Sequence, residues 1–293
     1  MKLSDLFAQK KPTLSFEVFP PKTGDTYDSV KNAAESIAAL KPDFMSVTYG
    51  AGGGTSKYTA SIAEDIYKKF GVTALAHLTC VNSDKKTVES VLSSLKSKKI
   101  ENILALRGDI SDKTDDKKRE YKYASSLVAD IKKYGDFCVG GACYPEGHPE
   151  DKSIYDSIEH LKEKVYAGCE FLTTQMFFDN NVLYSFLYKI REAHITVPVV
   201  AGIMPVTNGK QIKRICALSG TYLPQRFKSI VDRFGDNPPA MKQAGIAYAT
   251  EQIIDLLANG VNAIHVYSMN KPDIAAKIQE NLSEIIKKEA SDD

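Results

Sequence analysis

The sequence lacks an excess of charge of either sign, a long apolar run and, at its start, the apolar core typical of a signal peptide. Its 293 residues carry 38 lysines and arginines against 37 aspartates and glutamates, so the formal net charge is 38 − 37 = +1. This balance argues against a protein that binds nucleic acid or a membrane surface, because either needs a strongly basic face. No segment approaches the roughly 20 apolar residues that span a bilayer, and the start, MKLSDLFAQKKP, has no apolar signal-peptide core. The predicted location is therefore the cytosol, with no membrane partner.

Disulfide and metal signatures are also missing. The five cysteines are odd in number and show no C-x-x-C spacing, and the five histidines show no H-E-x-x-H pattern. Neither a disulfide scaffold nor a metal site is therefore expected.

What the sequence does have is a regular alternation of β-rich runs and helix-period segments. Eight short β-rich runs begin at positions 14, 44, 73, 102, 137, 171, 197 and 263. The first seven begin 26 to 35 residues apart, which suits one strand–helix–strand unit each, and the last interval is 66 residues. Several runs are apolar on both faces, as in a parallel sheet covered by helices. The pattern predicts an α/β protein with a (β/α)8 barrel, a single domain over residues 1–293.

The segments between the runs show the helix period. Residues 26–40, 84–98 and 153–168 place apolar side chains three and four positions apart, which predicts amphipathic helices. The long last interval contains three prolines between Thr221 and Pro239. We expect an extra short helix and loop there, as an insertion before the last strand.

In barrel enzymes the active site lies where the strands end, so the polar residues at the strand ends form one candidate set. So many ionisable groups on one rim favour an active site over a barrel kept only for structure. The set consists of Glu17, Thr48, Tyr49, His77, Thr79, Arg107, Asp109, Tyr144, Glu146, His148, Gln175, His265, Tyr267 and Asn270.

Two carboxyl groups of this set are candidates for acid or charge chemistry. Glu17 lies inside an apolar strand, where desolvation tends to raise the pKa of a carboxyl toward the range of a general acid. A structural ion pair with a lysine or arginine is an equally open interpretation of Glu17. For Asp109 the sequence slightly favours such a pair, with Arg107 as the partner.

Two loops have the composition of ligand-binding segments. The glycine-rich run at residues 50–56 follows the second strand, and its backbone N–H groups suit a phosphate, but it fits neither a dinucleotide-binding G-x-G-x-x-G nor a P-loop. The run YPEGHPE, residues 144–150, is stiffened by two prolines and suits a flat aromatic ligand. An ordinary surface loop is the alternative interpretation.

Nine motifs in succession give the chain a family resemblance. The chain resembles the methylenetetrahydrofolate reductases along nearly its whole length, and the spacing of so many motifs argues against chance. The motifs are SFEVFPPKT from Ser15, SVTYGAGGGT from Ser46, HLTC from His77, LALRGD from Leu104, YPEGHPE from Tyr144, LKEKVYAG from Leu161, TQMFFD from Thr174, GIMPV from Gly202 and HVYSMN from His265.

The resemblance implies a barrel that holds a flavin, usually FAD, which NADH or NADPH reduces and methylenetetrahydrofolate reoxidises in a ping-pong cycle. By this resemblance Glu17 is the general acid for the folate nitrogen, and Asp109 lies near flavin and pterin. Folate-contacting positions are Gln175, Gln211 and Lys271. The flavin-lining positions are Thr48, Tyr49, Ala51, His77, Arg107, Gly108, Asp109, Ala124, Tyr144, His148, His160 and Lys164.

Three positions depart from the family pattern. Ser157 replaces an acidic residue that holds the adenosine half of FAD, with Asp156 as a possible substitute, so FMN stays an alternative cofactor. Ile215 replaces an aromatic or leucine contact, and Lys271 replaces an arginine, which leaves NADH, NADPH and a partner protein open as electron donors.

The resemblance further implies small-molecule substrates, a homo-oligomer and, in some relatives, a partner subunit that delivers electrons. Because the sequence ends soon after the last barrel helix, we expect no regulatory domain of the eukaryotic kind. The alternative function is a flavin-free folate-binding methyltransferase or lyase on the same barrel, and a third is a non-catalytic barrel that binds folate or a partner.

Overall fold

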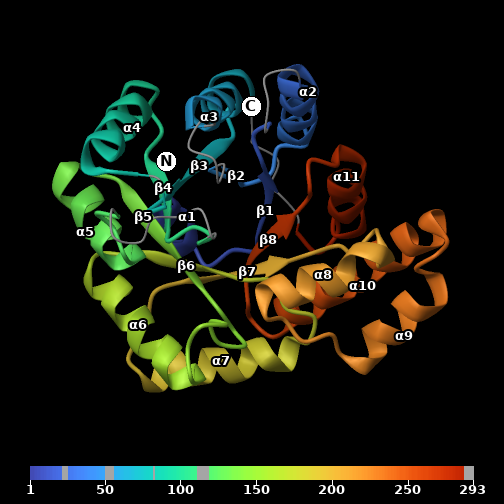
Figure 1. Ribbon diagram of the computed structural model, residues 1–293. Helices are drawn as coiled ribbons and strands as arrows, with labels where there is room; N and C mark the ends of the chain where they lie inside the picture. Colours follow the sequence, from blue (N-terminus) through green and yellow to red (C-terminus); the bar gives the residue numbers. More distant parts are fainter. Residues whose placement is uncertain (22–25, 50–55, 82, 111–118, 287–293) are drawn as a thin grey trace.

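Eight parallel strands close into a barrel in the order of the chain, from β1 to β8 (Figure 1). The computed structural model describes residues 1–21, 26–49, 56–81, 83–110 and 119–286, and for residues 56 and 57 it describes the backbone alone. The barrel confirms the predicted fold class, and each strand begins within two residues of its predicted start. The strands are β1 Thr13–Val18, β2 Phe44–Val47, β3 Thr73–Thr79, β4 Asn102–Leu106, β5 Cys138–Cys143, β6 Phe171–Thr174, β7 Val199–Ile203 and β8 Ala263–Tyr267.

The helices surround the barrel (Figure 1) and begin where the sequence supplies capping groups. The side chain of Asp84 accepts from the Thr87 N–H at the start of α4, and Ser153 accepts from the Asp156 N–H at the start of α6. Among the described residues the helices are α1 Leu3–Ala8, α2 Tyr27–Ala38, α3 Ser56–Phe70, α4 Lys85–Ser97, α5 Ala124–Tyr134, α6 Ile154–Tyr166, α7 Asn180–Glu192, α8 Gly209–Ser219, α9 Gln225–Phe234, α10 Pro238–Ala258 and α11 Pro272–Asn281.

The long interval before β8 holds the predicted insertion. Helix α9 is the extra short helix expected between Thr221 and Pro239, and Pro238 and Pro239 form the first turn of α10. Phe227 of α9 stacks on Tyr248 of α10 at 4.3 Å between ring centroids, which anchors the insertion against the barrel's outer layer. Within the described part of the chain, no helix is long and apolar enough to cross a membrane.

Helix α1, which the sequence did not reveal, closes one end of the barrel. Its buried side chains Leu3, Leu6 and Phe7 share a cluster with Phe44 and Phe171, the first residues of β2 and β6. The cluster therefore lies at the N-terminal ends of the strands. The ring of Phe7 meets those of Phe44 and Phe171 edge-on at 6.0 and 5.4 Å. This apolar floor leaves the C-terminal ends of the strands as the polar end.

The substitution Phe7→Ala tests how far stability depends on this floor. Removing a buried phenylalanine deletes its transfer free energy and leaves a cavity, so we expect the free energy of unfolding to fall by about 3 kcal/mol. Denaturant unfolding followed by circular dichroism measures it. Phe234→Ala, at an exposed ring on α9, is the control and is expected to change the free energy of unfolding far less. Equal losses in the two variants would contradict the assigned role of α1.

Candidate functional site

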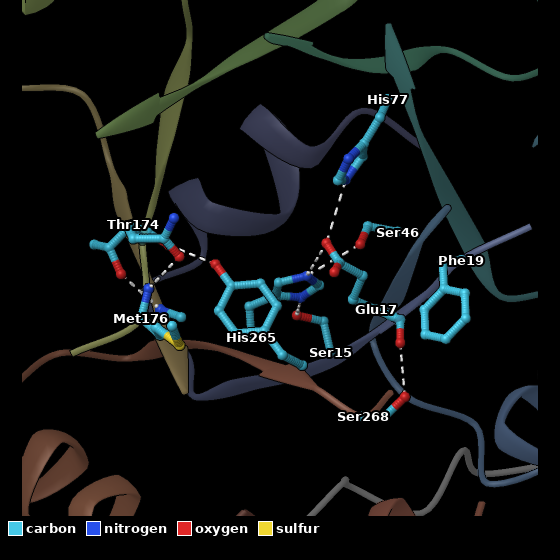
Figure 2. A network of polar contacts seen from close by, with 12 residues as sticks. Ser15, Glu17, Phe19, Ser46, His77, Thr174, Met176, His265 and Ser268 are labelled. Carbon is cyan, nitrogen blue, oxygen red and sulfur yellow. Dashed lines mark hydrogen bonds and ion pairs between the residues drawn. The ribbon is translucent and has the colours of Figure 1, made fainter. Parts of the chain in front are cut away.

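Glu17, near the end of β1, lies between two histidines at the polar end of the barrel. Its Oε2 is 3.7 Å from Nε2 of His77 on β3 and 4.0 Å from Nε2 of His265 on β8 (Figure 2). The Glu17 side chain is 20% exposed, whereas those of His77 and His265 are 5% and 2% exposed. Among the described residues, the basic groups within 4.0 Å of the Glu17 carboxylate are these two buried imidazoles, and no pair with a lysine or arginine is seen there.

His77 is neutral at pH 7 because it is buried. Burial lowers the pKa of its imidazole to about 4, and the nearby Glu17 carboxylate offsets only part of that effect. Within the described residues, Nε2 of His77 has no hydrogen-bond partner although it is buried. A buried polar atom without a partner costs free energy, and it points to a ligand or a mobile proton at this position.

The segment after β8 holds the end of β1 in place. The Ser268 hydroxyl donates to the Glu17 carbonyl oxygen at 2.6 Å. The Asn270 amide pairs with the backbone of Phe19 in both directions, accepting from its N–H and donating to its carbonyl oxygen at 2.9 Å each. Met269 and Asn270 adopt left-handed backbone conformations, with φ of 54° and 53°, to make this turn. The motif HVYSMN thus positions the Glu17 backbone.

Tyr267 and Gln175 lie beside this centre, on β8 and at the end of β6. The Tyr267 hydroxyl donates to the Thr174 carbonyl oxygen at 2.5 Å, and a Cβ at Gly202 would lie 2.4 Å from that hydroxyl. Gly202 therefore leaves the room that the tyrosine occupies. Burial and the neighbouring Glu17 raise the pKa of Tyr267 well above its ordinary value, so the phenol stays protonated. The side-chain oxygen of Gln175 accepts from the Met176 N–H at 2.9 Å.

The predicted ion pair of Arg107 with Asp109 is wrong. Arg107 binds Glu150 instead, through both guanidinium nitrogens at 2.5 and 2.9 Å. Two parallel bonds match the planar guanidinium to the carboxylate and tie the loop after β5 to the end of β4. Asp109 lies exposed beyond β4. Among the described residues, Asp109 forms no ion pair.

The loop YPEGHPE is ordered by contacts to α6. The ring of His148 meets that of Tyr144 edge-on at 4.7 Å. Ser157 of α6 accepts from the His148 N–H at 2.9 Å and donates to Asp151 at 2.6 Å. Asp151 also lies 3.2 Å from Nδ1 of the exposed His160. Ser157, a departure from the family pattern, is thus a loop-holding residue.

The sequence suggested Asp156 as the acid that compensates for Ser157, but its carboxylate accepts from Ser153 at the start of α6. The carboxylate that contacts Ser157 is that of Asp151, which sequence reasoning missed. In the sequence, the one feature that could have indicated Asp151 is its position between the fifth strand and the predicted helix 153–168.

The remaining predicted site residues lie around the same rim. The Lys164 ammonium donates to the Ala142 carbonyl oxygen at 2.5 Å, and burial lowers its pKa. The Lys271 ammonium donates to the Thr207 hydroxyl at 2.9 Å, which links the ends of β7 and β8. Ala51 and most of the glycine-rich run lie outside the described residues. The others are Thr48 and Tyr49 after β2, Gly108 after β4 with φ of 82°, Ala124 at the start of α5 and the exposed Gln211 in the first turn of α8.

Comparison with known proteins places this rim in a family. The sequence matches the family described as methylenetetrahydrofolate reductase over residues 2–283. The chain belongs to the methylenetetrahydrofolate reductase family. Methylenetetrahydrofolate reductase 1 of Schizosaccharomyces pombe is 35% identical over 291 residues, which cover 96% of this chain and 48% of that protein. For 5,10-methylenetetrahydrofolate reductase of Escherichia coli the identity is 33% over 270 residues, covering 92% and 90%.

The chain spans about half the length of the fungal and plant relatives and about nine tenths of the bacterial ones. Among solved structures, an uncharacterized protein from Clostridium thermocellum, described as binding two copies of 5-methyl-5,6,7,8-tetrahydrofolic acid, superimposes with a TM-score of 0.63 at 13% identity, covering 97% of this chain and 100% of that one. At that identity the likeness shows the shared fold alone.

The lowered pKa of His77 predicts a pH-dependent stability of the ligand-free protein. The unfolded chain binds a proton at His77 below about pH 6.5, whereas the folded protein binds it only near pH 4. Stability from this group is therefore complete at pH 7 and falls as the pH drops, by about 2 kcal/mol at pH 5.

Denaturant unfolding at pH 7 and pH 5 checks this prediction. His77→Gln, which cannot titrate, is expected to lose about 2 kcal/mol less than the parent protein between the two pH values. His194→Asn, at an exposed histidine after α7, is the control and is expected to keep the parental pH dependence. An unchanged pH dependence in His77→Gln would show that the imidazole is not held neutral.

Proposed function

We propose that this chain reduces 5,10-methylenetetrahydrofolate to 5-methyltetrahydrofolate with a bound flavin, and that NADH or NADPH supplies the electrons. The observation that carries the proposal is the position of Glu17. It is a carboxyl at the polar end of the barrel, partly exposed, with neutral nitrogen beside it in place of a cation. Such a group is suited to hold a proton and to deliver it to a substrate nitrogen.

The residues of the β4 and β5 ends fit a flavin. The buried Nε2 of His77 has no partner in the described structure; Arg107 and His148 lie on the segments after β4 and β5, and Lys164 lies on α6. A flavin offers acceptor atoms on its ring edge and phosphate oxygens on its tail, which are the groups that these side chains bind. When bound, the flavin supplies the hydride chemistry of the reaction.

Glu17 would supply the proton that opens the five-membered ring of methylenetetrahydrofolate. In the proposed step the carboxyl transfers its proton to the ring nitrogen that leaves the one-carbon bridge, and the C–N bond electrons pass to that nitrogen. The resulting iminium accepts the hydride, and Glu17 is left as a carboxylate. Ser268 and Asn270 hold the Glu17 backbone during this transfer. The exposed Asp109 would stabilise the positive charge of the iminium.

An anaerobic visible spectrum of the purified protein tests the proposal directly. A flavin absorption band that bleaches when 5-methyltetrahydrofolate is added, with no nucleotide present, is the expected result. Flavin released by heating and separated by chromatography distinguishes FAD from FMN. A protein that is colourless and binds neither flavin would overturn the proposal in favour of a flavin-free folate enzyme.

The substitution Glu17→Gln separates the two half-reactions. Because the amide holds no acidic proton, we expect folate turnover to fall at least about a hundredfold, the usual scale for a lost general acid. Flavin reduction by the nucleotide involves no folate proton and is expected to survive. Stopped-flow measurement of each half-reaction gives both rates, and parental folate turnover would refute the acid assignment.

The substitution Asp109→Asn tests the proposed charge effect. Removing a negative charge near the flavin is expected to make the flavin easier to reduce, and folate reduction is expected to slow because the iminium loses its counter-charge. Potentiometric titration reports the first effect and stopped-flow kinetics the second. Glu159→Gln, at an exposed carboxylate of α6, is the matched control. An unchanged flavin potential would remove Asp109 from the electrostatic role.

A further inference from the structure

Helix α10 has a glycine in its interior, at a position where a side chain would collide with the segment after β7. Gly245 is buried, and a Cβ there would lie 1.9 Å from the Val206 carbonyl oxygen and 2.7 Å from the Val206 carbonyl carbon. Cβ atoms essentially never come within 3.0 Å of such atoms. Glycine weakens a helix interior relative to alanine. The close approach of α10 to Val206, and not the helix itself, therefore explains the glycine.

Both sides of this contact are fixed by packing. The Val206 side chain is buried in a cluster that includes Phe227 of α9 and Met241 of α10. One turn along α10 from the glycine, the Tyr248 hydroxyl donates to the Phe178 carbonyl oxygen at 2.6 Å. A methyl group at the glycine would therefore have to displace the backbone between β7 and α8 or pull α10 away from this cluster.

A second close contact holds the other end of the same segment. Gly209, the first residue of α8, lies against Gly235 at the end of α9, and a Cβ at Gly209 would lie 2.6 Å from the Gly235 Cα. Helices α9 and α10 both belong to the long interval between β7 and β8. The extra length of this interval thus supplies a close backing for residues 206–209.

This backed segment lies next to predicted folate-contacting residues. The Thr207 hydroxyl accepts from the Lys271 ammonium at 2.9 Å, and Gln211 lies in the first turn of α8. The Val206 carbonyl and the Thr207 nitrogen belong to one planar peptide unit, so the two move together. A shift of this carbonyl away from α10 would therefore move the hydroxyl that holds Lys271.

We propose that Gly245 is a positioning residue for folate binding: it lets α10 lie against the segment after β7 and so sets the Thr207 hydroxyl that holds the Lys271 ammonium. Lys271 is a folate contact by the family resemblance, so this inference rests on the proposed function. A lysine side chain loses conformational entropy when it binds a ligand, and a partner that already holds it reduces that loss. The glycine thus contributes to folate affinity and not to the chemical step.

The substitution Gly245→Ala tests the proposal in the folate half-reaction. Because the added methyl group displaces the Val206 backbone, we expect the Kd of 5-methyltetrahydrofolate to rise about tenfold, the scale of one lost hydrogen bond to a charged group. The rate at saturating folate is expected to stay within about twofold of the parent rate. Flavin bleaching at increasing folate concentrations measures both quantities, and a parental Kd would overturn the proposal.

The control Gly135→Ala adds the same methyl group after α5, before the start of β5. It would lie 3.8 Å from the Phe137 ring, which is an ordinary contact, so the parental Kd is expected. Thr207→Val removes the hydroxyl and leaves the glycine in place, so it tests the same link if Gly245→Ala does not fold. We expect its Kd to rise at least about threefold, and an unchanged Kd would overturn the proposal.

A double-mutant cycle with Lys271→Met separates positioning from a general disturbance of the fold. If the glycine acts through the ammonium, adding Gly245→Ala to Lys271→Met is expected to raise the Kd by no more than about twofold. Flavin reduction by the nucleotide is expected to be unchanged in Gly245→Ala. The full loss of affinity in both backgrounds, or an equal loss in both half-reactions, would overturn the proposal.

Hydrogen exchange of the ligand-free protein tests the contact without any folate. In Gly245→Ala we expect faster exchange in residues 204–212 and parental exchange in α1. Unchanged exchange in residues 204–212 would overturn the proposal. If the parent protein bound no folate but the variant showed the faster exchange, the proposed function and the folate role of Gly245 would both have failed, and the backing contact would stand.

Discussion

The pairing of β1 with β8 is the interaction on which the site depends. These strands come from opposite ends of the sequence, and their parallel register sets Ser15 opposite His265 and Glu17 opposite Tyr267. Because side chains alternate along a strand, a slip of β1 by one residue would turn Ser15 and Glu17 out of the barrel and toward the helices. The register is fixed at both ends of the seam, by the Thr13 N–H on the Asn262 carbonyl and by the Ser268 hydroxyl on the Glu17 carbonyl.

Along the axis of the barrel, an apolar cluster lies at one end and the polar side chains of the candidate site lie toward the other. At the floor, α1 and the first residues of the strands form an apolar cluster in which Phe171 occupies space that a side chain at Gly140 would fill. One layer higher the interior becomes polar, with Ser15, Ser46 and His265 bonded to one another. The apolar floor excludes water from this layer, so its hydrogen bonds have no competitor and hold their geometry. Next to these three buried side chains, Glu17 is partly exposed to solvent.

The strands could be predicted from sequence because a strand buried on both faces is a short apolar run between turn residues, and the 30-residue spacing then indicates a barrel. The six-residue helix α1 could not, because it is too short to show a helix period. Closeness in the sequence also gave a wrong ion-pair partner. Arg107 is two residues from Asp109, but in the fold it pairs with Glu150, which is 43 residues away. The serine partners of His265 lie 219 and 250 residues away, beyond the reach of any sequence pattern.

A carboxyl that delivers a proton cannot be half of an ordinary ion pair. A lysine or arginine within about 4–6 Å of Glu17 would favour the carboxylate and lower the pKa of the acid by about one to three units. The structure places His77 and His265 beside the carboxyl, and burial lowers the pKa of His77 to about 4, so the His77 imidazole carries no positive charge at pH 7. The imidazole nitrogens of His77 and His265 lie 3.7 and 4.0 Å from the carboxyl oxygen, beyond hydrogen-bond distance. Arg107, which follows β4, is paired with both carboxylate oxygens of Glu150. Within the described residues no lysine or arginine forms an ion pair with Glu17, which is the arrangement that the proposed proton transfer requires.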